Sequence, residues 1–153
     1  MSSLDDEVWT QPTGPGQAGL VLVTGGAGYV GSAAVRALLD SGYRVRVLDL
    51  FMYGFPGPLA DMADHPHLEL IRGDVRDCDT VAAVMRDVDA VVHLAAIVGE
   101  PACMVDPELT VQVNVGGART VASLAKAMGV RRFVFASTCS VYGRVGGSEF
   151  VVT

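Results

Sequence analysis

Short apolar runs alternate along this chain with stretches in which apolar residues recur at helical spacing. The runs, five or six residues long, predict buried strands over residues 20–24, 44–49, 68–72, 89–94 and 132–136. The helical stretches between them cover residues 29–39, residue 77 or 79 to about 86, and 106–129. Asp77 or Asp79 can cap the second helix, and Asp106 with Pro107 begins the third. Residues 50–60, with room for a helical turn, and 95–105 are predicted loops.

This alternation of strand and helix predicts the topology. Repeated strand–helix–strand units give parallel strands joined by right-handed crossovers. We therefore predict an α/β fold, a doubly wound parallel sheet of order 3-2-1-4-5. A length of 153 residues suits one domain. We assign residues 20–153 to it, and residues 1–19, which hold three glycines and two prolines without apolar periodicity, to a flexible tail.

Composition and charge narrow the partners. Eleven basic residues against seventeen acidic ones give a formal charge of −6, and no basic run exceeds Arg131-Arg132. Nucleic acids and anionic membranes require clustered Lys and Arg, so we expect neither as a partner. No apolar stretch approaches the ~20 residues of a spanning helix, and the acidic segment Met1–Glu7 lacks the positive start of a signal peptide. We expect a cytoplasmic protein.

Cysteine and histidine spacing gives no metal or disulfide signal. Cys78, Cys103 and Cys139 are an odd number without a CxxC pair, so we expect reduced thiols. His65 and His67 have no matching carboxylate or thiolate constellation, so we predict no metal site.

A glycine motif directly follows the first predicted strand. Gly25, Gly28 and Gly31 lie three residues apart, and Gly26 also completes a GxGxxG pattern. A lone pattern of this kind is weak, but a strand before it and a helix after it make it specific for dinucleotide binding. The first glycines allow a tight turn and close approach to a pyrophosphate, and Gly31 lets the helix pack against the strand.

The helix that follows the motif supplies the second half of a phosphate site. Its start, at Gly28, Tyr29 and Val30, directs free backbone N–H groups and a partial positive charge at the phosphates. A P-loop NTPase is the competing interpretation, because Gly26 and Gly31 have the Walker spacing. Ser32 stands where that motif requires Lys, which excludes it.

Asp49 ends the second predicted strand, 18 residues after Gly31. This is close to the ~20-residue spacing at which an acid accepts hydrogen bonds from the adenosine ribose. Its charge would repel a 2′-phosphate, and Leu50 rather than Arg follows it, so we predict NAD rather than NADP.

Five segments together resemble the extended short-chain dehydrogenase/reductase family, in its NAD-dependent nucleotide-sugar epimerase/dehydratase group. Residues 24–31 resemble its TGxxGxxG fingerprint, Gly73–Asp77 its acidic turn, and His93–Ala96 the end of its fourth strand. Asn114 and residues 136–143 match the next two landmarks in order. The resemblance covers residues 20–143, specifies the superfamily closely and the substrate much less.

The resemblance implies roles for these residues. Asp74 and Val75 are expected at the adenine, Leu94–Ala96 along the cofactor beyond the pyrophosphate, and Asn114 beneath the active site. The full set of expected cofactor-binding residues is Gly25, Gly28, Tyr29, Val30, Gly31, Asp49, Leu50, Asp74, Val75, Leu94, Ala95, Ala96, Asn114 and Ser137.

Thr138 aligns with the Ser/Thr that hydrogen-bonds the reacting sugar oxygen in this family. That oxygen alternates between alcohol and carbonyl, and one neutral hydroxyl can accept from the first and donate to the second. We interpret His93 as a strand-end residue rather than a base. Residues Gly99–Cys103 lie near the expected nicotinamide side and are a weaker candidate for substrate contact.

The catalytic pair of this superfamily, Tyr with Lys four residues later, does not occur in this sequence. The Lys lowers the pKa of the phenol so that it can take the hydroxyl proton during hydride transfer. Lys126 is the only lysine, and the residues four after the tyrosines are Ala33, Val47, Gly57 and Gly146. We therefore expect a truncated NAD-binding Rossmann domain that lacks the sixth strand and substrate region, with no activity by itself.

Three interpretations remain open at this point. The first is part of a nucleotide-sugar epimerase, dehydratase or ketoreductase, whose parent enzyme acts on a nucleotide sugar. The second is a non-catalytic, self-standing dinucleotide-binding module, and the third is an NADPH-dependent sugar ketoreductase. An apolar face normally covered by the missing part would favour a homo-oligomer.

Overall fold

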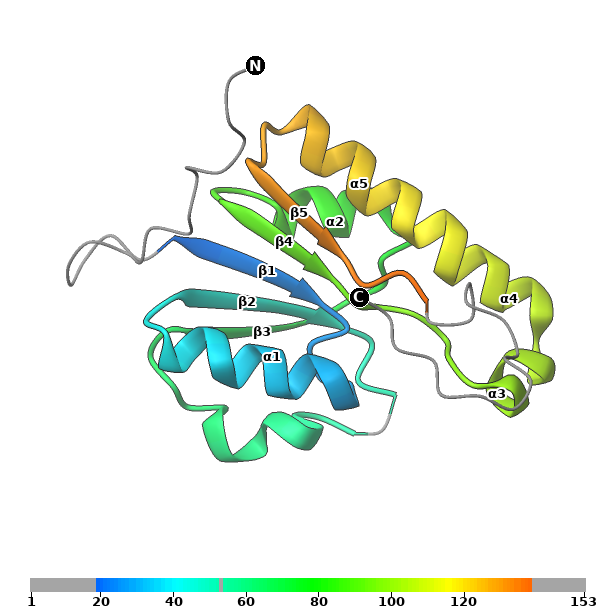
Figure 1. Cartoon of the computed structure of the whole chain (residues 1–153), viewed down its shortest axis with the longest axis horizontal. Helices are drawn as coiled ribbons and strands as arrows, with labels where there is room; N and C mark the ends of the chain where they lie inside the picture. The colour runs from blue at the N-terminus through cyan, green and yellow to red at the C-terminus, as the bar shows by residue number, and fades with distance from the viewer. Residues whose placement is uncertain (1–18, 53, 139–153) are drawn as a thin grey trace, which may run out of the picture.

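One parallel sheet of five strands forms the centre of the molecule, with helices on both faces (Figure 1). This computed structural model describes residues 19–52 and 54–138. The strands are β1 (Leu20–Thr24), β2 (Arg44–Asp49), β3 (Leu68–Arg72), β4 (Ala90–His93) and β5 (Arg132–Phe135). Their order is β3-β2-β1-β4-β5, which confirms the predicted fold and topology. The predictions for residues 1–18 and 139–153, including Cys139 and Tyr142, lie outside the described residues.

Alternation along the strands divides the core into two clusters. Val21 and Val23 of β1 face one cluster with Val35 of α1 (Tyr29–Asp40). Leu22 faces the other cluster, with Val121 of α5 (Ala118–Ala127), and α2 (Cys78–Val84) packs on the same face. A strand buried on both faces must be apolar throughout, which explains the continuous run that β1 shows in the sequence.

Predicted capping residues mark two helix starts. The Asp77 side chain accepts a hydrogen bond from the N–H of Asp79, and α2 follows directly. The Asp106 side chain accepts from the N–H of Leu109, and Pro107 opens α4 (Pro107–Val111). Each carboxylate satisfies an N–H group that the helix itself leaves free, so these starts are local events.

The structure corrects the prediction in two places. The predicted loop 95–105 contains a short helix, α3 (Glu100–Val105), after Gly99 with φ 90°. None of its side chains is buried, so the sequence has no apolar periodicity that would predict this helix. The helix predicted from Asp106 to Gly129 is interrupted by a π-helical segment, η2 (Gln112–Gly117). The helical turn for which the loop 50–60 has room is present as a 3-10 helix, η1 (Gly57–Met62), which extends two residues beyond the predicted loop.

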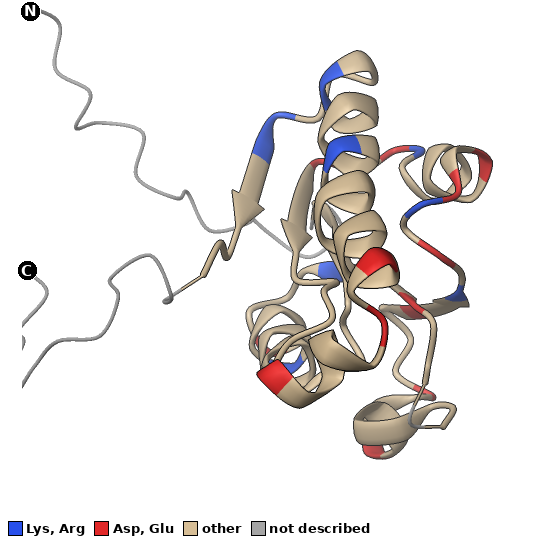
Figure 2. Cartoon of the chain, turned by 90° about the vertical axis from the view of Figure 1, so that its right-hand side faces the viewer, with Lys and Arg blue, Asp and Glu red and all other residues tan. Residues whose placement is uncertain are grey.

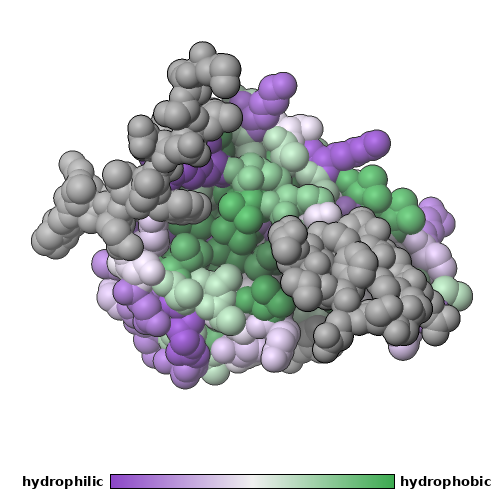
Figure 3. All heavy atoms as spheres, in the orientation of Figure 1, coloured by the Kyte–Doolittle hydropathy of each residue, from purple (hydrophilic) through white to green (hydrophobic). Residues whose placement is uncertain are grey.

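The two sides of the sheet differ in how they are covered. Helix α1 packs against β1 and β2, whereas in Figure 1 the same face of β4 and β5 carries no helix of the described residues. Val134 of β5, on this face, is 42% exposed, and Figure 3 shows apolar surface over the open part of the face. Phe133 and Phe135, 38% and 55% exposed, alternate to the opposite face, where their rings contact His93. No helix in the described part of the chain combines the length and the apolar character needed to cross a membrane.

Candidate functional site

The glycine turn after β1 leaves no room for a side chain at Gly25 or Gly31. Gly25 has φ 72°, and a Cβ there would lie 2.6 Å from the backbone N of Ala95 at the end of β4. A Cβ on Gly31 would overlap the carbonyl oxygen of Gly25 and lie 2.7 Å from the Cα of Gly26. The chain therefore bends tightly between β1 and α1 because these positions lack Cβ atoms, as the motif predicts.

Helix α1 begins directly on this turn. Gly28 is its N-cap, and it has no side chain to accept from the first helical N–H groups. Those groups have no partner inside the helix, and the aligned peptide dipoles add a partial positive charge. Tyr29 and Val30 are 95% and 63% exposed, so the first turn is open to a ligand. This arrangement suits a phosphate group.

Asp49 joins the glycine turn to the loop after β2. Its carboxylate accepts from the N–H of Ala27 at 3.0 Å and from the N–H of Phe51 at 2.8 Å. A carboxylate has about four acceptor positions, so two remain for ribose hydroxyls. The ribose role of Asp49 stays a prediction from sequence spacing, whereas its bond to Ala27 is a contact that the tertiary structure shows. Leu50, the next residue, is exposed.

Arg72, a cation that no sequence motif indicates, lies beside this acid in the sheet. Arg72 of β3 is in register with Asp49 of β2. Its guanidinium lies 5.9 Å from the ring centre of Phe51 and 5.8 Å from that of Phe55. Sequence neighbours alone could not reveal this, because 23 residues separate Arg72 from Asp49.

The acidic turn after β3 is held by an ion pair. Asp74 Oδ2 lies 2.6 Å from Arg76 Nη2, and hydrogen bonding from Arg76 lowers the pKa of Asp74. Arg76 also donates to Gln112 Oε1 at 3.2 Å. Val75 is buried against Gly117, whose Cβ would lie 2.6 Å from Val75 Cγ2. An adenine contact by residues 74 and 75 stays a prediction.

The segment after β4 is tied to the π-helical turn. Asn114 Oδ1 accepts from the N–H of Ile97 at 2.8 Å, and Asn114 Nδ2 donates to the Ile97 carbonyl at 2.9 Å. This two-bond clamp orients the backbone that follows Leu94, Ala95 and Ala96. A π-helical turn is uncommon and often marks a functional position. The role of Asn114 toward an active site stays a prediction.

The predicted residues gather at one edge of the sheet. The five strands are parallel, so the glycine turn, Asp49, the acidic turn, residues 94–97, and Ser137 with Thr138 follow strand ends on the same side. Ser137 has φ 57°, and both it and Thr138 are exposed. In doubly wound folds this edge, where strand order reverses between β1 and β4, is the place for a ligand.

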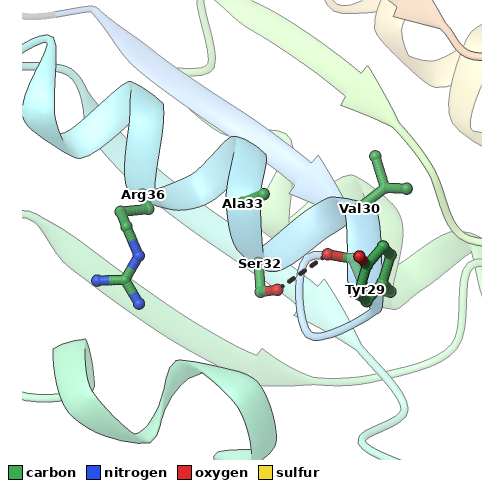
Figure 4. A pocket seen from close by; sticks show the side chains of 5 residues that line it. All are labelled: Tyr29, Val30, Ser32, Ala33 and Arg36. Atoms are coloured by element: carbon green, nitrogen blue, oxygen red, sulfur yellow. Dashed lines mark hydrogen bonds between the residues drawn. The ribbon is translucent and has the colours of Figure 1, made fainter.

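An open pocket of about 450 Å³ runs along α1 beside this edge. Tyr29, Val30, Ser32, Ala33 and Arg36 line it (Figure 4), and the Ser32 hydroxyl donates to the Tyr29 carbonyl at 3.1 Å. Arg36 pairs with Asp61 of η1 at 2.7 Å. The pocket follows the outer side of the helix and extends the exposed surface of its first turn.

Charges and metal-ligating groups are dispersed over the described residues. Lys and Arg lie on several separate elements in Figure 2, with acidic residues between them. Within residues 19–52 and 54–138, no three His, Cys, Asp or Glu side chains come together as possible metal ligands. The chemistry of the site is therefore carried by backbone N–H groups, Asp49 and polar side chains at the sheet edge.

A glycine turn against a helix start, with an acid ending the next strand, defines a Rossmann-type dinucleotide-binding domain. The chain belongs to the NAD dependent epimerase/dehydratase family, whose family model matches residues 21–152. This confirms the family resemblance, and NAD as the cofactor that the family description names.

Named relatives show how far the match extends. The chain is 38% identical over 129 residues to a 3 beta-hydroxysteroid dehydrogenase/Delta 5→4-isomerase of Mycobacterium tuberculosis, covering 82% of this chain and 33% of that protein. It is 39% identical to a UDP-glucose 4-epimerase of Streptomyces lividans, covering 82% and 38%. The structure of DesIV, a dTDP-glucose 4,6-dehydratase of Streptomyces venezuelae with NAD bound, matches with a TM-score of 0.79 and 37% identity, covering 86% and 43%. The chain thus spans well under half the length of these proteins.

Proposed function

We propose that this chain is the NAD-binding part of a nucleotide-sugar epimerase or dehydratase. The observation that carries the proposal is the joint placement of the glycine turn and Asp49, linked by the Asp49–Ala27 hydrogen bond. Both parts suit a dinucleotide: backbone without Cβ for the pyrophosphate, and a carboxylate with free acceptor positions for the ribose.

Each group at the sheet edge has a distinct task in this proposal. N–H groups at the start of α1 hold the pyrophosphate, and Asp49 accepts hydrogen bonds from the adenosine ribose. Residues 94–96, oriented through the Asn114 clamp, line the cofactor farther along. The Thr138 hydroxyl holds the reacting oxygen of the substrate. When bound, NAD supplies the acceptor for a hydride from the sugar carbon.

The isolated chain has no catalytic turnover in this proposal. Proton removal from the sugar hydroxyl needs a base, and no Tyr-x-x-x-Lys pair occurs in the 153 residues. Measurable sugar-dependent reduction of NAD by this chain would contradict that. A self-standing binding module remains the alternative, and a reading frame that continues into Tyr-x-x-x-Lys would exclude it. We place the parent enzyme in the cytoplasm as a homo-oligomer.

The substrate class rests on the weaker part of the comparison. Identity to the steroid dehydrogenase/isomerase, 38%, is close to identity to the UDP-glucose epimerase, 39%, so these residues do not separate the two chemistries. The UDP-glucose epimerase and the DesIV dTDP-glucose dehydratase, by their names, act on nucleotide sugars, which supports the assignment of a sugar substrate. Titration of the full parent enzyme with a nucleotide sugar and with a hydroxysteroid distinguishes the two substrate classes.

Cofactor choice is tested on the chain itself. We expect NAD to bind about tenfold or more tightly than NADP, because Asp49 repels a 2′-phosphate. Asp49→Asn removes the charge but keeps one acceptor oxygen, so it should reduce the difference in affinity between NAD and NADP. Asp61→Asn changes an exposed acid of η1; it is the matched control and should keep the wild-type preference. Calorimetric titration measures all three proteins, and a clear NADP preference in wild type would favour the NADPH-dependent ketoreductase instead.

A further inference from the structure

His93 connects the ends of three strands. It closes β4, is in register with Thr24 at the end of β1, and is only 2% exposed. Its ring stacks on Phe135 of β5 with centroids 5.8 Å apart, and lies 6.3 Å from the ring of Phe133. The roles proposed above leave this buried imidazole unassigned.

The hydrogen bonds around Thr24 determine which form of His93 fits. Thr24 Oγ1 lies 2.6 Å from His93 Nδ1, and the N–H of Ala95 donates to the same hydroxyl oxygen at 3.4 Å. If the hydroxyl donates to an unprotonated Nδ1, the hydroxyl hydrogen and the Nδ1 lone pair are both satisfied, and the hydroxyl oxygen still accepts from Ala95. If Nδ1 carries a proton, the hydroxyl must accept from it, and its own hydrogen points into a buried site. An unmade bond of this kind is costly, so the geometry favours Nδ1 as acceptor.

The same contacts set the distance between the glycine turn and residues 94–96, the two segments that the proposal places against the cofactor. Thr24 directly precedes the glycine turn, and its carbonyl accepts from the N–H of Leu94 at 3.0 Å. Gly25 and Ala95 approach so closely that a Cβ on Gly25 would lie 2.6 Å from the Ala95 nitrogen. A small displacement of β1 relative to β4 would therefore change the distance between the turn and residues 94–96.

We propose that neutral His93 is a positioning residue: by accepting the Thr24 hydroxyl hydrogen it keeps the glycine turn and residues 94–96 at the separation that the dinucleotide requires. The inference rests on the proposed cofactor function of this edge. Protonation converts Nδ1 from an acceptor into a donor and breaks the arrangement, so cofactor affinity falls as His93 becomes charged.

Among residues 19–52 and 54–138, the elements around His93 supply no buried charge that would stabilise an imidazolium. Burial alone lowers the pKa of His93 below its usual value. β1 has no charged residue, and Phe133 and Phe135 are the β5 side chains in ring contact with His93. The charged residues of β5 and α5, namely Arg132, Arg119 and Lys126, are all exposed. Desolvation therefore favours the neutral form in the folded protein.

Three variants separate this role from general packing. His93→Asn keeps an acceptor near the position of Nδ1 and removes the titration. Thr24→Val keeps the shape of the side chain and removes the hydroxyl. His65→Asn is the matched control, because His65 Nδ1 also accepts a hydrogen bond, from the N–H of His67 at 3.2 Å, in the loop before β3.

NAD affinity is measured from about pH 7.5 downward, past the ordinary histidine pKa of ~6.5, to the lowest pH at which circular dichroism still shows folded protein, because burial lowers the pKa of His93. We expect wild type to bind about tenfold more weakly at the acid end, as for the loss of one hydrogen bond. His93→Asn should bind within about threefold of wild type at the upper pH, with a flat profile. Thr24→Val should be about tenfold weaker throughout, and His65→Asn should follow wild type.

The imidazole itself provides a readout that does not depend on NAD. Nitrogen NMR of the ring should show an unprotonated Nδ1 at the upper pH. A protonated Nδ1, a flat wild-type profile in folded protein, or an unchanged pH dependence in His93→Asn would each overturn the role of His93. Failure of wild type to bind NAD at any pH would instead overturn the proposed function, and the NMR result would still decide the tautomer.

Discussion

Strands β1 and β5 are both short apolar segments of one sheet, and their surroundings are opposite. All five residues of β1 are buried, whereas all four residues of β5 are exposed. β1 lies between β2 and β4 with α1 on one face and α2 and α5 on the other, while β5 is an edge. The comparison shows that the half of the molecule around the glycine turn covers its own core, and that the β5 side retains apolar surface for further contacts.

The glycine turn should be the most sensitive point of the covered half. Gly31→Ala introduces a Cβ that overlaps the Gly25 carbonyl, so we expect a loss of about 3 kcal/mol in the free energy of unfolding. Gly116→Ala is the matched control, because its Cβ meets nothing within 4 Å. It should be neutral or stabilising by about 0.5 kcal/mol. Urea denaturation measures both, and equal effects would show that the turn can relax.

The same substitution in β1 and β5 tests the comparison directly. Val23→Ala should destabilise the protein by about 2 kcal/mol, because Val23 is 0% exposed and its loss leaves a cavity. Val134→Ala should cost less than about 1 kcal/mol, because Val134 is already 42% exposed. Chemical denaturation at several protein concentrations measures the difference. Equal costs that grow with concentration would mean that a second copy covers β5 in solution.

The ion pair in the acidic turn should give the smallest effect. Arg76→Gln removes the partner of Asp74, but both side chains are partly exposed, so we expect a loss of about 0.5 kcal/mol or less at neutral pH. Arg76 holds the pKa of Asp74 below its usual 3.8, so the carboxylate stabilises the fold above that pH. The contribution is lost as pH falls through the lowered pKa in the folded state.

Urea denaturation of wild type and Arg76→Gln, repeated from neutral pH down to below the pKa of Asp74, measures the difference in the free energy of unfolding. The difference between the two proteins should be largest near neutrality and should disappear in acid. Arg36→Gln, which removes a more exposed pair with Asp61 on the α1 side, is the control. A difference that grows toward low pH would show that the assigned sign is wrong.

Local signals in the sequence predicted most of the fold and the glycine-turn part of the site. The caps at Asp77 and Asp106 act on N–H groups two or three residues away, so a short window contains all the necessary information. Helix α3 escaped prediction because its exposed side chains give no apolar period. The π-helical turn was not predicted, because its residues still follow helical spacing approximately.

Contacts between distant segments could not be predicted in the same way. Thr24 and His93 are 69 residues apart in sequence and 2.6 Å apart in the structure. Sequence patterns placed each at a strand end, but only the pairing of β1 with β4 brings their side chains into register. Arg72 and Phe51 meet for the same reason, through the pairing of β2 with β3.

Local sequence patterns specify the order of strands and helices, the turn between β1 and α1, and the family to which the chain belongs. These properties depend on apolar periodicity and on glycines at fixed spacing, which act over a few residues. Contacts between distant segments determine that Asp49 bonds to the glycine turn, that His93 connects three strand ends, and that β5 is exposed in the described part of the chain. Hydrogen bonds and burial between remote segments arise from packing, and packing is a property of the whole fold.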